Sequence, residues 1–258
     1  MNTKTLRFFS WITLAAFLPA SFAFAAPAGQ ITQTSGHVAV TGPTGKVTSA
    51  GSGQPVEAGE TVTLGDGANA VLKFQDGQII ALQSKSIFKV NRYKYDQAAP
   101  EKGESFFSIV QGGLRAITGL IGNSNKAGWK LATPTATIGI RGTDFMAVIN
   151  QATYLKVDAG VISATNSAGT AVFTAGQTGA VASGTALGTV IPASSVPAGT
   201  FGELGAINVG AAGGAATGSA AAAGGTILGV PTGVVIGVGI AAGAAAAASG
   251  GGNSTSHH

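Results

Sequence analysis

The sequence predicts an all-β domain of short strands, followed by a low-complexity tail rich in glycine and alanine that has room for one helix. Three observations lead to this prediction. Between residues 30 and 180, short runs alternate apolar with polar side chains, and turn residues separate them roughly every 8 to 12 positions. Charged residues make up only 9% of the 258 residues, and glycine contributes 41. No lysine or arginine follows Lys156. This spacing is typical of a sandwich, a barrel or a β-solenoid.

Residues 1–25 have the features of a secretory signal peptide. Lys4 and Arg7 precede an apolar core that runs from Phe8 to Phe22. The triplet Ala23-Phe24-Ala25 has the small-x-small pattern that signal peptidase cleaves, here before Ala26. An uncleaved anchor is the less favoured alternative, because a membrane span needs about 20 apolar residues. We expect an exported protein of the periplasm or cell surface.

The composition excludes several kinds of site. There is no cysteine, so disulfides, thiolate metal sites, a cysteine nucleophile and lipid attachment at a new N-terminal cysteine are all excluded. The three histidines are His37, His257 and His258, too few for a histidine-based metal site or acid–base pair. The last two are either native or part of an affinity tag. The net charge of +4 falls to +2 (12 − 10) without Lys4 and Arg7, too little to indicate nucleic-acid binding.

Strand-like runs follow one another from Gly36 onward. Asp76-Gly77 separates an alternating run at residues 70–75 from the next run at Ile79, and an Asp-Gly pair there predicts a hairpin because it accepts positive φ. Gly112-Gly113 predicts a bend or bulge in its run. The later strand-like runs are Ile87 to Tyr95, Phe106 to Thr118, Tyr154 to Asp158 and Ala171 to Thr174.

The stretch TPTATIGIRGTDF, from Thr133 to Phe145, combines a buried-strand pattern with a glycine corner. Thr133-Pro134 imposes an extended entry, because proline disfavours helical geometry in the residue before it. Apolar residues then alternate with small or polar ones up to Gly142-Thr143, which breaks the strand. Arg141 and Asp144 bracket that break. An arginine fork can satisfy a carboxylate or carbonyls at a tight corner, so we interpret the two as structural, with a recognition pair as the alternative.

From about Gly29 to Gly179 the sequence resembles FecR-type domains. The motifs that carry this resemblance are G-x-V at Gly36 to Val38, Gly59 with GDG at Gly65 to Gly67, F-x-D-G at Phe74 to Gly77, I-x-L-x-x-x-S-x-F-x-V from Ile80 to Val90, G-G-L-R at Gly112 to Arg115, and TPTATIGIRGTDF, which is the most specific. The resemblance implies an all-β, solenoid-like domain similar to those of periplasmic sensor and regulatory proteins. We expect its motif residues to be structural: Asp76, Gly77, Arg115, Thr133, Pro134, Arg141, Gly142, Thr143 and Asp144.

The best-known proteins with this domain begin with a cytoplasmic helical region that holds a sigma factor, followed by a membrane span. Here the domain follows the signal peptide almost directly, so we do not expect this chain itself to hold a sigma factor. The resemblance implies a sensing, regulatory or protein-interaction module of the cell envelope. The alternative is a structural component of the cell surface or extracellular matrix, associated with polysaccharide.

Candidate binding residues are few. The basic run Lys85, Lys89, Arg92 and Lys94, with Tyr93 and Tyr95, could bind an anionic polymer such as an acidic polysaccharide, although such a run is more often a solvated strand face. The isolated Asp66, Asp76 and Asp96 lack a calcium-loop pattern and are interpreted as turn residues. There is no nucleophile elbow, paired-carboxylate motif or phosphate-cradling loop. We therefore expect a protein that is not an enzyme, without cofactor or metal; the sequence does not identify its ligand.

The domain boundaries expected are a signal peptide at 1–25, the β-domain at 26–180, a linker at 181–225, an apolar segment at 226–248 and a disordered end at 249–258. Gly225, Gly229, Gly233 and Gly237 stand four apart, which places them on one face of a helix. The apolar segment could span a membrane, self-associate or stay unstructured. Glycine costs about 1 kcal/mol per helical residue relative to alanine in water, whereas lipid leaves helix as the only option for this segment.

Overall fold

The computed structural model describes residues 27–210. The expected signal peptide and the apolar segment 226–248 lie outside the described residues. The prediction of an all-β domain is confirmed: strands dominate, and they join into a mixed sheet of 15 strands. Within the described range, no helix is both long enough and apolar enough to cross a bilayer.

The strands follow one another with short connections. They are β1 (Gly29–Ser35), β2 (Val38–Thr41), β3 (Val47–Ser49), β4 (Pro55–Val56), β5 (Thr61–Leu64), β6 (Asn69–Phe74), β7 (Ile79–Leu82), β8 (Ile87–Lys94), β9 (Glu104–Ile117), β10 (Trp129–Ala132), β11 (Thr137–Asn150), β12 (Ala152–Asn166), β13 (Gly169–Thr174), β14 (Thr178–Val181) and β15 (Thr189–Ile191). The short helices are η1 (Pro100–Lys102), α1 (Leu120–Ser124), η2 (Lys126–Gly128), η3 (Ala193–Ser195) and α2 (Gly202–Ala206).

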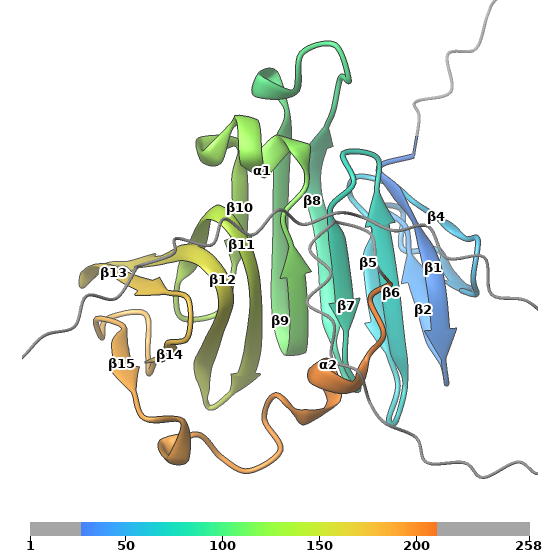
Figure 1. The fold of residues 1–258 in the computed structure, drawn as a ribbon. Helices are drawn as coiled ribbons and strands as arrows, with labels where there is room; N and C mark the ends of the chain where they lie inside the picture. Colours follow the sequence, from blue (N-terminus) through green and yellow to red (C-terminus); the bar gives the residue numbers. More distant parts are fainter. Residues whose placement is uncertain (1–26, 211–258) are drawn as a thin grey trace, which may run out of the picture. The chain divides into compact units, whose positions relative to one another are not determined.

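The strands form two layers that face each other across one core. Sheet I has the order β3, β2, β5, β8, first half of β9, β10, first half of β11, second half of β12, β13. Sheet II has the order β4, β1, β6, β7, second half of β9, second half of β11, first half of β12, β14, β15. Every pairing is antiparallel except that of β9 with β10. Figure 1 shows the strands side by side, from β1 and β4 at one end to β13 and β15 at the other. Of the forms expected, this pairing supports the sandwich.

Three long strands belong to both sheets, and each changes sheet at a glycine with positive φ. The bends lie at Gly112 (φ 78°) in β9, Gly142 (φ 57°) in β11 and Gly160 (φ 77°) in β12. The register between β11 and β12 shifts between Arg141 and Phe145, where both strands change sheet. Positive φ is strained for residues with a side chain, which explains glycine at these positions. The predicted breaks at Gly112 and Gly142 are thus bends inside continuous strands.

Neighbouring bends also pack directly on one another. A Cβ on Gly160 would overlap the carbonyl oxygen of Gly142, and a Cβ on Gly112 would stand 2.5 Å from the Cα of Ser86, in the β7–β8 connection. At the β1–β2 connection, a Cβ on Gly36 would lie 2.9 Å from the Cα of Ala68. Small residues therefore let the strands approach one another at their normal separation at these bends and connections.

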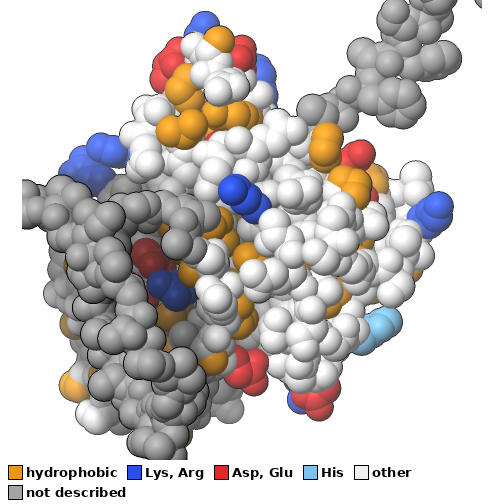
Figure 2. Space-filling view, turned by 45° about the vertical axis from the view of Figure 1, so that its right-hand side comes forward, with side chains coloured by type: hydrophobic (Ala, Val, Ile, Leu, Met, Phe, Trp, Pro, Cys, Tyr) orange, Lys and Arg blue, Asp and Glu red, His pale blue; other side chains and the backbone are white. Residues whose placement is uncertain are grey.

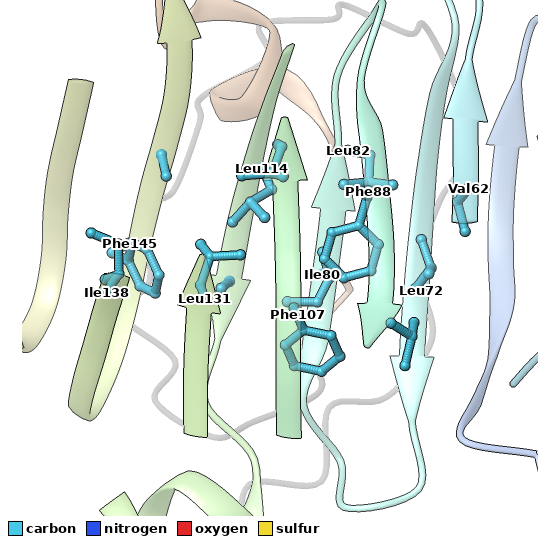
Figure 3. Packing of buried hydrophobic residues seen from close by; sticks show 14 of the residues in the cluster. Val62, Leu72, Ile80, Leu82, Phe88, Phe107, Leu114, Leu131, Ile138 and Phe145 are labelled. Carbon is cyan, nitrogen blue, oxygen red and sulfur yellow. The ribbon is translucent and has the colours of Figure 1, made fainter. Parts of the chain in front are cut away.

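The space between the sheets holds a chain of aromatic rings. Phe107 of β9 lies at its centre, with ring centroids 5.1 Å from Phe74, 5.4 Å from Phe88 and 6.1 Å from Trp129. Trp129 continues the chain to Phe145 at 6.0 Å. Figure 3 shows Phe88 and Phe107 among the aliphatic side chains of the neighbouring strands. Aromatic pairs of this geometry contribute about 0.5–1.5 kcal/mol beyond their buried area, so β10, which carries Trp129, is tied to both sheets.

The folded domain extends beyond the boundary expected at residue 180, which corrects part of the expected linker. Residues 189–210 form β15, η3 and α2, and residues 201–209 cross the outer face of sheet II. Leu204 is fully buried against Met146 and Val148, and Ile207 packs beside both apolar clusters of that face. The Gly/Ala/Ser/Thr-rich composition conceals these few apolar anchors, which is why the segment resembles a linker. We call residues 201–209 the C-terminal strap.

The stacked bends give a first testable prediction. Gly160→Ala should lower the free energy of unfolding by about 2–4 kcal/mol, because strain at positive φ adds to overlap with Gly142. Gly176→Ala is the matched control, with a similar φ of 83° but open space around its Cβ. It should cost only about 1 kcal/mol, the strain alone. Urea unfolding of both variants measures the difference, and equal losses would contradict the stacking.

Candidate functional site

Asp76 joins the two sheets at the sandwich edge opposite the Gly112 bend. Its side chain is 1% exposed. Its Oδ1 accepts hydrogen bonds from the Tyr93 hydroxyl at 3.1 Å and the Gln78 amide at 3.2 Å, and its Oδ2 accepts one from the Ile121 amide at 3.3 Å. Burial raises the pKa of the Asp76 carboxyl, an effect that these amide donors partly offset. Asp76 thus links the β6–β7 hairpin of sheet II to β8 of sheet I and to α1, a larger role than the turn residue expected.

The remaining residues of the β6–β7 turn behave as the sequence predicts. Gly77 has a φ of 82°, and its amide donates to the Phe74 carbonyl at 3.0 Å. Tyr93, one of the two tyrosines of the basic run, points its hydroxyl at Asp76 rather than into solvent, and its ring lies 5.3 Å from that of Phe74. The pKa of Tyr93 is raised by its burial and then by the Asp76 charge. Tyr93 is therefore part of the fold and does not line the basic surface.

Asp144 pairs with Arg115, and this differs from the bracketing pair with Arg141 that the sequence suggested. Arg115 Nε donates to Asp144 Oδ1 at 2.9 Å and its Nη2 donates to Oδ2 at 2.7 Å, a two-pronged ion pair across β9 and β11. The two side chains are 20% and 22% exposed. The pKa of Arg115 is raised, chiefly by this hydrogen bond. Residue 144 follows the Gly142 bend and lies on sheet II, whereas Arg141 precedes the bend on sheet I, which explains why the sequence neighbours do not meet.

The threonines of the motif hold two corners together. Thr143, beside the Gly142 bend, exchanges hydrogen bonds with the Thr118 hydroxyl, at 2.9 Å through its amide and 3.0 Å through its carbonyl. Thr133 caps the Pro134 turn by accepting from the Ala136 amide at 3.0 Å. The Thr133 hydroxyl also accepts from the hydroxyl of the buried Thr153 at 3.2 Å. Through these contacts Thr143 and Thr133 each join two segments of the chain.

The outer face of sheet I carries a broad hollow. It is a groove of about 860 Å³ that crosses β8, β9, β10, β11 and β12, and it continues into a second hollow of about 390 Å³ that reaches β13. The segment 125–128, with η2, forms a wall beside the two hollows. The residues that matter for the argument are Arg92, Phe106, Lys126, Lys130, Gly139 and Ser163.

Strand pairing places these side chains in one row across the sheet. Arg92 lies opposite Phe106, Phe106 opposite Lys130, and Gly139 opposite Ser163. Residues directly opposite one another share a face of the sheet. Ile138, the neighbour of Gly139 on β11, is fully buried on the inner face, so Gly139 and its row face outward. The lack of a side chain at Gly139 leaves the floor of the groove low. Arg141, two residues further along β11, points to the same face and lines the second hollow.

The groove is basic although the chain as a whole is nearly neutral. Arg92, Lys126, Lys130 and Arg141 line the two hollows, and Glu104 is the one acidic residue lining them, which gives a net +3 (4 − 1). Lys89 and Lys94 project from the same side of β8. By contrast, the loop beyond β8 and β9 carries both signs: Figure 2 shows blue and red side chains together at its tip. The local charge is therefore concentrated on one sheet face.

The structure separates the predicted basic run and adds residues that the sequence reading missed. Lys85 sits in a turn with φ 58° and pairs with Asp66 at 3.1 Å, away from this face. Phe106, Lys126, Lys130, Gly139 and Ser163 were not predicted. The alternation that predicts Ile138 and Ile140 to face inward also assigns residues 137, 139 and 141 to the outer face. The sequence pattern of β11 could therefore have predicted part of the groove. Within residues 27–210, no three histidine, aspartate or glutamate side chains are grouped to hold a metal ion.

The buried Asp76 predicts a pH-dependent stability. Its folded pKa is raised above 3.8, so the folded state binds the proton more tightly than the unfolded state. This contribution is complete below 3.8 and is lost as the pH rises through the folded pKa. Relative to Asp76→Asn, the unfolding free energy of the wild type should therefore increase between about pH 7 and about pH 4. Urea unfolding of both proteins tests this; other carboxylates cancel in the difference, and a pH-independent difference would refute it.

The Arg115–Asp144 pair predicts a measurable coupling energy. A double-mutant cycle of Arg115→Ala and Asp144→Ala should give about 1–2 kcal/mol, more than for exposed pairs, because the contact is two-pronged and only about one fifth exposed. Arg115→Lys keeps the charge but removes the fork, so it should lose most of the coupling. The exposed pair Lys85–Asp66 is the control and should show no coupling above error. Equal coupling in both cycles would count against this role.

Comparison with known proteins relates part of this chain to a described family. Two crystal structures described as "a putative anti-sigma factor" from Parabacteroides distasonis ATCC 8503, at 1.65 and 2.50 Å resolution, are similar to this chain, each with 11% sequence identity and a TM-score of 0.40. Each similarity covers 51% of this chain, and the chain spans 58% of the length of those proteins. No curated protein matches the chain. Residues 60–163 match the family model described as FecR protein. This segment contains the Asp76 hairpin and the bends at Gly112, Gly142 and Gly160, and it is a FecR-type domain.

Proposed function

We propose that the chain is an exported, non-enzymatic protein of the cell envelope that acts by binding, as a sensing or regulatory module. The observation that carries this proposal is the position of the groove residues in the sequence. Nearly all of its lining residues, from Arg92 to Ser163, belong to the segment that matches the FecR model, and only Thr165 and Val172 lie outside it. The segment shared with the family therefore also builds the open surface.

The two outer faces of the sandwich support different roles. The C-terminal strap covers apolar side chains of sheet II, including Met146 and Val148, so that face contributes to stability. The groove face of sheet I has no such cover among the described residues. Its side chains project from strands whose backbone groups are hydrogen-bonded, which gives a rigid platform. A rigid, uncovered, charged platform suits recognition of a partner.

Export and location rest on the sequence. The signal-peptide pattern at residues 1–25 supports secretion, with the domain in the periplasm or at the cell surface. We propose that the apolar segment 226–248 attaches the domain to the membrane or to further copies of the chain. The glycine spacing at Gly229, Gly233 and Gly237 supports close helix packing in either case.

A second candidate function is a structural component of the cell surface or matrix that holds polysaccharide. The basic groove favours it, because its lining combines positive charges with the hydroxyls of Thr137, Ser163 and Thr165. The two candidates differ in what the cell loses with the protein. A regulator controls transcripts, whereas a structural component retains polymer at the surface.

Complementation of a deletion strain tests the proposal. Wild type should restore a defined set of altered transcripts, Arg92→Ala/Lys130→Ala should not, and the control Lys73→Ala on sheet II should behave as wild type. Loss of surface polymer with unchanged transcripts would instead establish the structural candidate. Full complementation by the groove variant would refute the groove as the site, and a mature chain that still begins at Met1 rather than Ala26 would refute export.

A further inference from the structure

We propose that the groove on sheet I binds an extended polysaccharide that carries carboxylates, laid across the strands from β8 to β12. This inference rests on the proposed function and deepens it, because it names the class of ligand for the same surface.

The charge of the groove fits a polyanion of low charge density. Arg92 and Lys130 stand two strands apart, which is about 10 Å at the usual strand spacing. Lys126 on the wall and Arg141 beyond Gly139 continue the positive charge toward β12. Uncharged positions separate these cations, so the surface matches a chain with one charge per unit better than a densely charged one. Charge complementarity of this kind steers a polyanion to the groove.

The floor of the groove fits hydroxyl-rich units between the charges. Thr137, Ser163 and Thr165 offer hydroxyls that can donate and accept, and Gly139 leaves room above the sheet. Phe106, half-buried between Arg92 and Lys130, gives a flat apolar surface between two cations. A chain of sugar rings that carries carboxylates presents the complementary groups: hydroxyl edges, negative charges and apolar ring faces.

The same features disfavour an acidic peptide as the occupant. A peptide that binds a sheet by adding a strand needs an unpaired edge, yet the groove lies over β9, β10 and β11, which are paired on both sides. Peptide side chains also need apolar anchor pockets. Apart from the buried Trp129, Phe106 is the one large apolar residue that lines the first hollow. We therefore treat an acidic peptide as an outcome of the test.

Glu104 gives the proposal a distinctive signature. Its carboxylate pairs with Arg92 at 3.2 Å, with side chains 45% and 69% exposed, and it is the acidic residue of the groove. It competes with an incoming carboxylate for the Arg92 guanidinium. Glu104→Gln should therefore strengthen binding of a carboxylated polymer, opposite to the effect of removing a cation.

Titration calorimetry of the purified full chain with oligogalacturonate tests the inference. Binding should occur at low salt and weaken as salt rises, because exposed charge pairs are screened. Lys126→Ala/Lys130→Ala should weaken it by about 5- to 25-fold, since each exposed pair contributes up to about 1 kcal/mol, or about fivefold. Ser163→Leu should weaken it without changing charge, by filling the floor. The control Lys73→Ala should leave it unchanged, and equal unfolding temperatures should show that the variants are folded.

Three comparison ligands decide the class. A neutral maltooligosaccharide of the same length should not bind, and poly-L-glutamate and a single-stranded oligonucleotide should bind more weakly than oligogalacturonate. Equal or tighter binding of either polyanion would overturn the inference, as would no binding of oligogalacturonate or binding that the double variant does not alter. If any of these results is obtained while complementation still requires the groove residues, a polysaccharide ligand is refuted, but the proposed function as a binding module is not. If groove variants complement fully, the proposed site itself is refuted.

Discussion

The structure depends on one constraint: neighbouring strands that change sheet must do so at the same level. Gly142 and Gly160 bend the paired strands β11 and β12 together at one edge of the sandwich, and Gly112 bends β9 at the opposite edge, beside the β7–β8 connection; φ lies between 57° and 78° at the three glycines. Because the Gly160 bend rests on the Gly142 carbonyl, the position of one bend determines the position of the next. The register of both sheets, and with it which side chains face inward, follows from these bends.

The bends also explain why the two outer faces differ. On sheet II, β7 and the second half of β11 carry apolar side chains on both faces, and the outer ones are buried by the C-terminal strap. On sheet I, the outer positions of β9, β10 and β11 are polar, charged or small except for Phe106 and Val110 of β9. Before its bend, β11 alternates inward apolar residues with outward small or polar ones, whereas from Phe145 to Ile149 it is apolar on both faces. The outer face of sheet II therefore contributes to folding energy, and the outer face of sheet I stays uncovered among the described residues.

Much of the fold could be predicted from the sequence, because it is encoded locally. The Asp76-Gly77 turn, the inward positions Ile138 and Ile140 and the break at Gly142 all follow from alternation and turn chemistry. The partners of Asp144 and Tyr93 could not be predicted, since Arg115 and Asp76 approach them only through strand pairing over 29 and 17 residues. The groove was missed for the same reason: its row joins single residues from five strands. The strap was missed because its apolar anchors stand isolated in a stretch of small residues.

The insertion of β10 has a consequence for how this architecture diversifies. The strands β9 and β11 pair directly with each other in sheet II, so segment 118–136 is a cassette carried within a hairpin that closes without it. That cassette supplies Lys126 on the wall and Lys130 on the floor of the groove, while only Trp129 and Leu131 of β10 enter the main core. A lineage that keeps these two inward residues, together with the contacts of Thr118, Ile121 and Thr133, can exchange Lys126 and Lys130 and so change the groove without refolding the scaffold. Part of the groove can therefore vary apart from the long strands that set the fold.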